Sequence, residues 1–306
     1  MADTSNVSDF MQIVRTVYGS ALQTALLRGL AYTIPDHSTL NEKFGVQSGV
    51  QPKTTPTLRY YVIGDGGHTL QAGADGIPYS APVRHRASDA ALYSHQPFVL
   101  CQEGNDLATD VRNSFAIRTK ETWNNKNYIG YYAKRTVEDE TSKKIIMEHT
   151  TVKNGVSNTV PFIPTSENLK PKAPEVSSRE ATTTNGDYLS VSNDIGIVFD
   201  VTDVNNYINV HRIKNNNPLR AIISEIGLCT GVDQTVTGDG VGNAKISYLE
   251  AIGLQIATHV TVYHAVGYTN KGFEIRVELG ANEPMMGEGA LGVTTKITNT
   301  TDNVRE

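Results

Sequence analysis

Hydrophobic and polar residues alternate in short runs along most of the chain, which is the pattern of half-buried β-strands. The runs are bounded by Asn, Gly, Glu or Asp, and of these Asn, Gly and Asp favour turns. The clearest alternation covers 254–266 and 273–279, and we interpret the intervening 267–272 as a hairpin connection. Further strands are expected at 58–63, 97–101, 115–118, 128–135, 145–153, 188–201 and 221–230.

The N-terminal part shows a helical period instead. From Asp9 to Arg28, apolar residues recur every three or four positions, Ser8 stands at the expected N-cap and Gly29 at the expected C-terminal cap. We therefore expect a long N-terminal amphipathic helix, the longest or nearly the longest of the chain. More than one of its faces is apolar, so either its own domain or a neighbouring copy must cover it. The candidate subunit-interface positions are Phe10, Val14, Val17, Ala21 and Leu26.

The distribution of proline, glycine and polar residues divides the chain into four consecutive segments. Residues 1–57 are expected to form the helix and an extended arm, and 58–160 a β-rich domain with short helices at 87–95 and 107–113. Prolines punctuate 161–186, which indicates a linker or arm. Residues 187–306 are expected to form a second β-rich domain with a flexible tail. The expected fold is mostly β, with antiparallel domains, a long N-terminal helix and extended arms.

Composition supports this fold class and narrows the range of partners. The 306 residues include 33 Thr and 28 Val but only 18 Leu, an excess of β-branched residues. The net charge of −5 argues against nucleic acid as the main partner. Neither a secretion signal nor a membrane span is evident, so we expect a soluble protein made in a reducing cytoplasm. Cys101 and Cys229 are expected to be buried thiols.

Two glycine-rich runs invite a comparison with phosphate-binding loops. Gly64–Gly67 follows an expected strand, and Gly238–Gly242 lies in a connector. Neither has the spacing of a dinucleotide-binding fingerprint or the lysine of a P-loop. We interpret both as turns, in which glycine supplies positive φ angles.

Three histidines and three aspartates lie close together in the sequence, and such a group of side chains can bind a metal ion. They are Asp65, His68, Asp75, His85, Asp89 and His95. No pair has the HExxH spacing and no acidic loop matches a calcium pattern, so we expect no metal.

The carboxylates of Asp106/Asp110 and of 138–140 fall in polar connectors and are expected to be solvated. No nucleophile elbow is present. The sequence therefore favours a protein that is not an enzyme and needs no cofactor.

Three stretches resemble a known group of proteins. They are Leu58-Arg-Tyr-Tyr-Val-Ile-Gly-Asp-Gly-Gly-His68 with its continuation to Tyr79, His85-Arg-Ala-Ser-Asp-Ala-Ala-Leu-Tyr93 with Pro97-Phe-Val-Leu100, and Ile223-Ser-Glu-Ile-Gly-Leu-Cys-Thr-Gly-Val-Asp233. Together they resemble uncharacterised virion structural proteins of contractile-tailed bacteriophages. The resemblance spans about residues 58–280 and includes no catalytic motif.

The resemblance implies a structural subunit of the virion that is made in the host cytoplasm. The expected role is a tail or baseplate component that binds other virion proteins and forms a homo-oligomeric ring. A neck, collar or head–tail connector protein is the alternative within this class. A carbohydrate-binding or hydrolytic particle protein is the alternative of another class, because an aromatic cluster offers rings that stack on sugars. The members of that cluster are Trp123, Tyr128, Tyr131 and Tyr132.

Overall fold

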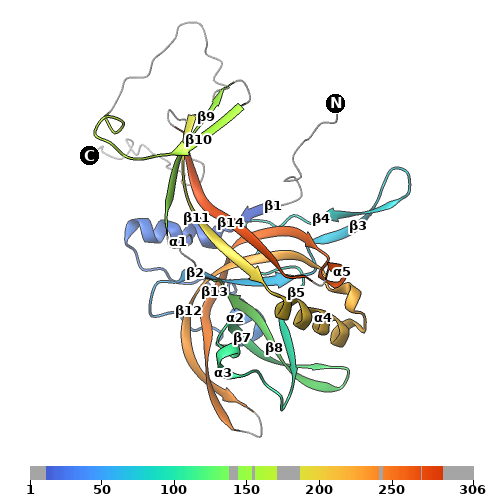
Figure 1. The fold of residues 1–306 in the computed structure, drawn as a ribbon. Helices are drawn as coiled ribbons and strands as arrows, with labels where there is room; N and C mark the ends of the chain where they lie inside the picture. The colour runs from blue at the N-terminus through green and yellow to red at the C-terminus, as the bar shows by residue number, and fades with distance from the viewer. Residues whose placement is uncertain are drawn as a thin grey trace, which may run out of the picture. The chain divides into compact units, whose positions relative to one another are not determined.

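The computed structural model groups the chain into two compact units (Figure 1). The first unit comprises residues 1–136 and 198–274, and the second comprises residues 137–197 and 275–306. This differs from the four consecutive segments expected from the sequence, because strands from both halves of the chain pair in one sheet. The structure describes residues 12–137, 144–153, 156–170, 187–240, 244–269 and 271–284.

The first unit is built on an antiparallel sheet of eight strands. The strand order is β1-β13-β12-β2-β8-β6, with β5 paired to β2 and β7 paired to β8. Strand β2 thus lies beside β12, although about 160 residues separate them in the sequence. The strands are β1 (Gln12–Arg15), β2 (Thr57–Gly64), β5 (His95–Gln96), β6 (Val99–Gln102), β7 (Phe115–Trp123), β8 (Lys126–Arg135), β12 (Ile223–Asp239) and β13 (Lys245–His264).

Two smaller sheets complete the β structure. Strands β3 (His68–Ala72) and β4 (Pro78–Pro82) form a two-stranded hairpin in the first unit. The other sheet has the order β10-β9-β11-β14. The expected hairpin between 254–266 and 273–279 is wrong, because β13 and β14 belong to different sheets and the short helix α5 (Val266–Thr269) follows β13. The strands of this sheet are β9 (Ile146–Lys153), β10 (Val156–Pro161), β11 (Asp187–Phe199) and β14 (Phe273–Pro284).

The large sheet is buried on both faces at β2. Tyr60 and Val62 point into a core cluster that includes Leu254 of β13. Tyr61 points the other way, where its ring meets Phe98 edge-on at 5.3 Å. Alternate side chains therefore serve two cores, which explains why the run Tyr60–Ile63 is apolar without interruption. The mostly antiparallel β class expected from the sequence is confirmed.

The long N-terminal helix is not observed. Residues 12–15 form β1, which pairs with β13, and helix α1 begins only at Val17 and ends at Arg28. Thr16 causes the change of structure: its hydroxyl donates to the Ile256 carbonyl at 2.6 Å, and the same oxygen caps the helix. The expected end of the helix is confirmed, because Gly29 adopts φ 61° in the left-handed C-terminal cap.

The longest helix within the described ranges is α4 (Val201–Asn215), which sequence reasoning missed. It has 15 residues, compared with 12 in α1. Asp200 and Asp203 form a capping box at its start, and Val204, Tyr207 and Val210 bury one face. The abundance of Asn hides this stripe. The remaining helices are α2 (Leu40–Phe44), α3 (Thr109–Arg112) and the 3₁₀ turn η2 (Pro218–Arg220).

Three further expectations from the sequence concern residues 87–95, the proline-rich segment 161–186 and the C-terminal tail. The short helix expected at 87–95 is wrong, because that segment is irregular and ends in β5. Most of the proline-rich segment 161–186 and most of the tail lie outside the described residues. Within the part of the chain that the structure describes, no helix is long and apolar enough to cross a membrane.

Candidate functional site

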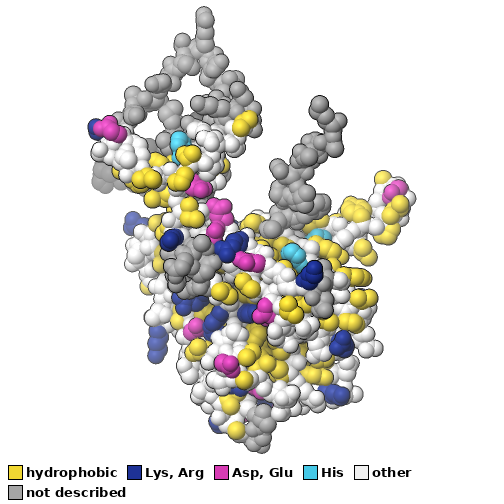
Figure 2. All heavy atoms as spheres, viewed as in Figure 1, with side chains coloured by type: hydrophobic (Ala, Val, Ile, Leu, Met, Phe, Trp, Pro, Cys, Tyr) yellow, Lys and Arg dark blue, Asp and Glu magenta, His cyan; other side chains and the backbone are white. Residues whose placement is uncertain are grey.

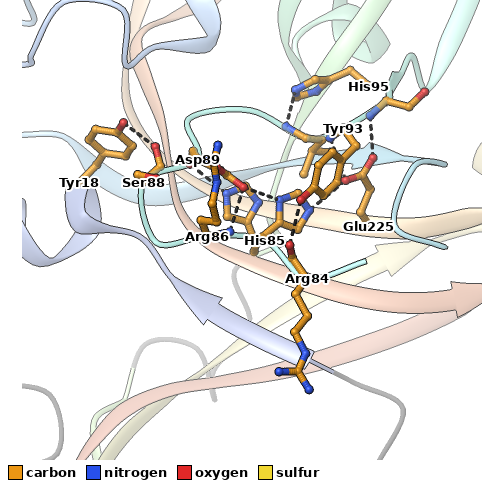
Figure 3. Close-up of polar contacts among 12 residues, drawn as sticks. Tyr18, Arg84, His85, Arg86, Ser88, Asp89, Tyr93, His95 and Glu225 are labelled. Atoms are coloured by element: carbon orange, nitrogen blue, oxygen red, sulfur yellow. Dashed lines mark hydrogen bonds and ion pairs between the residues drawn. The ribbon is translucent and has the colours of Figure 1, made fainter. Parts of the chain in front are cut away.

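Three segments far apart in the sequence meet around one buried side chain, Glu225, and Figure 3 shows it beside His85 and Tyr93. Glu225 lies near the start of β12, and its carboxylate has no exposed surface. The glycine-rich turn after β2 approaches it from one side, and the irregular loop 84–95 approaches it from the other. We call Glu225, His85, Asp89 and His259 the Glu225 cluster.

Four donors surround the Glu225 carboxylate. Backbone N–H groups of Gly66 and Ser94 donate to Oε1 at 3.0 and 2.8 Å. The Tyr93 N–H donates to Oε2 at 3.0 Å, and His85 Nε2 lies 3.0 Å from the same oxygen. One carboxylate therefore holds two separate loops against β12. A buried carboxylate is stable only when its lone pairs are satisfied in this way.

His85 links the carboxylate to the rest of the cluster. Its side chain is almost fully buried, and its Nδ1 lies 3.6 Å from Asp89 Oδ2. The His85 ring stacks on His259 of β13 with 4.0 Å between centroids, and Tyr93 covers its other side at 4.5 Å. Two carboxylates and two aromatic rings thus fix the position and orientation of this imidazole.

The loop 84–95 is also held from outside the cluster. On the α1 side, the Tyr18 hydroxyl donates to the Ser88 carbonyl at 2.8 Å, as Figure 3 shows, and the Val17 N–H donates to the Ala87 carbonyl. Within the loop, the Tyr93 hydroxyl donates to the Arg84 carbonyl. A segment without regular secondary structure is thereby given one defined conformation.

Burial sets the protonation of the histidines in this region. It lowers the pKa of His259 to about 4, and the Nε2–H of the neutral ring donates to the Asp89 carbonyl at 3.0 Å. Burial also lowers the pKa of His95 to about 3, with Nε2 accepting from the Leu92 N–H at 2.9 Å. For Asp89, burial alone would raise the pKa, but hydrogen bonds from Arg86 outweigh it and lower the pKa.

The glycines at 64–67 allow the backbone to pack closely against β12, and they are not needed for the geometry of a turn. None of Gly64, Gly66 and Gly67 has a positive φ, which corrects the interpretation made from the sequence. A Cβ on Gly64 would lie 2.5 Å from Glu225 Oε1, and one on Gly67 would lie 2.1 Å from the Ser224 carbonyl oxygen. Side chains are excluded here because the backbone packs directly on β12.

Substituting Gly67 by Ala is therefore expected to destabilise the protein by about 2 kcal/mol, since backbone must move to make room. The matched control is Gly196→Ala, because a Cβ at this strand position meets nothing closer than 4.0 Å. Urea unfolding of both variants and the parent measures the difference. Equal stabilities for the two variants would contradict the close packing described for Gly67.

The contacts of the Glu225 cluster hold two loops in place against β12. Its side chains are largely buried, and the His85 ring lies between the carboxylates of Glu225 and Asp89, at 3.0 and 3.6 Å. The sequence-predicted histidines separate: His85 joins the cluster, His95 packs on Phe44 and His68 lies against Tyr263. Among the described residues, no group of three His, Cys, Asp or Glu side chains is arranged to hold a metal ion.

A second buried polar group corrects the expectation for Asp106. Its carboxylate accepts from the Tyr131 hydroxyl at 2.6 Å and from Arg118 at 2.9 Å, and its side chain is nearly buried. Burial alone would raise its pKa, but these hydrogen bonds lower it. Asp106 is therefore an internal ion-pair partner and not a solvated connector residue. Asp110 lies on the exposed side of α3, and residues 138–140 lie outside the described part of the chain.

The aromatic cluster is partly buried, with Trp123 and Tyr128 half-exposed. Tyr131 and Tyr132 are buried in β8, and Lys214 lies over the Trp123 ring at 4.7 Å. The thiols of Cys101 and Cys229 are free, the first partly exposed and the second fully buried. Burial raises the pKa of both, that of Cys101 to about 11, so neither is an activated nucleophile at neutral pH.

The five candidate interface residues have different environments. Phe10 lies outside the described residues, and Val14 is half-buried within β1. Val17, Ala21 and Leu26 are exposed on α1, whose inner side buries Leu22 and Ala25. Three of the five positions therefore remain available on an outer surface.

The fold and the Glu225 cluster define a mostly antiparallel β protein whose irregular loops are held from within the sheet. Residues 1–294 match the model of a family of unknown function (DUF7208), and the chain belongs to that family. Comparisons with curated proteins and with solved structures gave no match. The sequence analysis pointed to the segments that form the cluster, but it did not identify Glu225 or His259 as residues of a site. The available signal was a lone acidic residue within the apolar run of 221–230.

Proposed function

We propose that this protein is a structural subunit of a tailed-phage particle and acts by binding neighbouring subunits. A tail or baseplate position is the primary proposal, and a neck, collar or connector position is the alternative. The observation that carries the proposal is a set of large apolar side chains exposed on two elements at the surface of the first unit. The resemblance of the three sequence stretches supplies the phage context.

The first of these elements is the β3–β4 hairpin. Leu70 is 77% exposed, Ile77 64% and Tyr79 50%. In Figure 2, hydrophobic side chains are visible along this projecting ribbon. Apolar side chains near the turn of a two-stranded hairpin are unfavourably exposed to water unless another surface covers them. A contact with a neighbouring subunit supplies that cover.

The second element is the outer side of α1 and the residue after its cap. Val17 is 52% exposed, Leu26 56% and Leu27 68%, and Leu30 follows at 61%. Burying one such side chain at an interface contributes roughly 1.5–3 kcal/mol. This contribution corresponds to about a tenfold to hundredfold change in affinity per residue.

Charged substitutions on these elements are therefore expected to weaken self-association and incorporation into particles by at least about tenfold. The variants are Leu70→Asp with Ile77→Asp on the hairpin, and Leu26→Asp with Leu27→Asp on α1. The control is Leu169→Asp, an exposed position outside both elements. Sedimentation velocity over a range of concentrations measures self-association, and immunodetection in purified particles measures incorporation.

The parent chain and the control are expected to form the same oligomer and to enter particles equally. A parent chain that stays monomeric at every concentration and is absent from particles contradicts the proposal. Normal assembly of both double variants would show that these two surfaces are not the interfaces. The position of the chain in a reconstruction of the particle then distinguishes baseplate from neck.

A further inference from the structure

The second unit has an edge strand that carries no charge. Strand β10 (Val156–Pro161) stands at one end of the order β10-β9-β11-β14, and β9 is its only partner among the described strands (Figure 1). All six of its residues are exposed. Sheet edges are commonly protected by charged side chains, because free backbone groups pair readily with another strand. At the opposite edge, β14 has such charges in Arg276 and Glu278.

The hydrogen bonds to β9 show which backbone groups of β10 are free. The Phe162 N–H donates to the Met147 carbonyl at 2.8 Å, and the same register holds along the whole of β10. The backbone groups of successive residues in an antiparallel strand point alternately towards the partner and away from it. Ser157 and Thr159 therefore direct both N–H and C=O away from β9. Pro161, at the next outward position, has no N–H to offer.

A second copy of β10 fits this edge in one register. A two-fold axis makes two identical edge strands antiparallel, so a symmetric dimer supplies the pairing. If the axis passes through Asn158, Ser157 of each copy faces Thr159 of the other, and both pairs exchange backbone hydrogen bonds. An axis at Thr159 would place Ser157 opposite Pro161, which cannot donate. An axis at Ser157 would place Thr159 opposite a position before β10 begins.

The side chains of β10 also match one another in this register. Val156, Asn158 and Val160 lie on one face of the strand, because side chains alternate along it. Across the axis, Val156 of each copy lies beside Val160 of the other, and these side chains are 69% and 45% exposed in the single chain. Asn158 meets its own counterpart, and two amides can both donate and accept. Backbone groups, apolar side chains and amides are thus paired together, with no like charges opposed.

We propose that β10 pairs with β10 of a second copy of this chain about a two-fold axis at Asn158. The pairing joins the four-stranded sheets of the two copies into one continuous sheet. It uses none of the residues assigned to the hairpin and α1 surfaces, so it does not rest on a role in a phage particle. One short strand makes a weak contact, which is strengthened wherever other contacts hold two copies together.

Disulfide trapping in the full chain tests the axis. The background is Cys101→Ser, because Cys101 is a partly exposed free thiol. Facing Cα atoms in a non-hydrogen-bonded antiparallel pair are about 4.5 Å apart, which a disulfide can span. Under mild oxidation, Asn158→Cys is therefore expected to form a covalent dimer.

The two valine positions provide matched controls for the register. Val156→Cys alone and Val160→Cys alone are expected to stay monomeric, because the two copies of either residue lie about 13 Å apart across the axis. An equal mixture of these two variants is expected to give the mixed dimer. Non-reducing gel electrophoresis and mass spectrometry measure the products.

A proline variant tests the backbone pairing. Added to Asn158→Cys, Ser157→Pro removes an outward N–H but no hydrogen bond to β9, and it is expected to reduce the dimer at least about tenfold. Ser157→Ala keeps the N–H and is expected to cross-link as before, and circular dichroism checks that both variants are folded. The proposal is overturned if Asn158→Cys forms no more dimer than Val156→Cys, or if the mixed valine variants give no mixed dimer. Equal cross-linking of folded Ser157→Pro and Ser157→Ala overturns it as well.

Discussion

Glu225→Ala is expected to cause one of the largest losses of stability of any single substitution in the first unit. The change removes the acceptor for three backbone N–H groups and the partner of His85 Nε2. Each buried donor left unpaired costs about 1–3 kcal/mol, so we expect a loss of at least about 3–5 kcal/mol. Glu225→Gln keeps the shape but replaces one acceptor by a donor, and we expect a loss of about 2 kcal/mol.

Urea unfolding measures both losses, and hydrogen exchange locates them. The amides of Gly66, Tyr93 and Ser94 are expected to lose protection first, because the missing oxygen atoms held them. Glu167→Gln is the matched control, since this side chain is 76% exposed in a surface ion pair. A Glu225→Ala variant as stable as that control would contradict the role assigned to the carboxylate.

The second large effect is a loss of stability as the pH falls from about 6.5 towards 4. His259 and His95 are neutral when folded, with pKa values of about 4 and about 3, whereas an unfolded histidine titrates near pH 6.5. Between these values the unfolded chain binds more protons, so acid favours unfolding. At about 1.4 kcal/mol per pKa unit, His259 alone accounts for a loss on the order of 3 kcal/mol.

Unfolding free energies measured from pH 8 to pH 4 test this effect. His259→Gln keeps a donor towards the Asp89 carbonyl but cannot titrate, so its profile is expected to be flatter in this window. Asp89 has a depressed folded pKa, so its contribution is present above the unfolded pKa and is lost only at lower pH. A parent profile that is level between pH 6.5 and 4.5 would contradict the burial of neutral histidines.

The strands were largely predictable because alternation reports the one property that a half-buried strand requires. The N-terminal helix was predicted too long because Ile13 and Val14 fit a helical stripe as well as a strand. The outcome depended on a tertiary contact, the pairing of residues 12–15 with 258–261. Helix α4 was missed for the opposite reason: its capping box was visible, but asparagines dilute its apolar stripe.

The candidate site was only partly predictable. The glycine run, His85 and Asp89 were noticed individually, but a carboxylate inside a β-strand gives no local sign of its partners. The partners of Glu225 lie 131 to 159 residues away in the sequence. Similarly, the solvated interpretation of Asp106 failed because Arg118 and Tyr131 approach it from neighbouring strands. Polar networks of this kind follow from topology, which local patterns do not encode.

The pairing of β1 with β13 has a consequence for synthesis on the ribosome. Gln12 pairs with Thr261, which lies 249 residues later in the chain. At about 5–20 residues per second, the first strand therefore waits roughly 12–50 s before its partner has been made. For most of that interval β2 also lacks its neighbour β12, although β8, its neighbour on the other side, is made earlier. The sheet of the first unit is therefore complete only after nearly the whole chain has been made, and its early strands spend longer without their final partners.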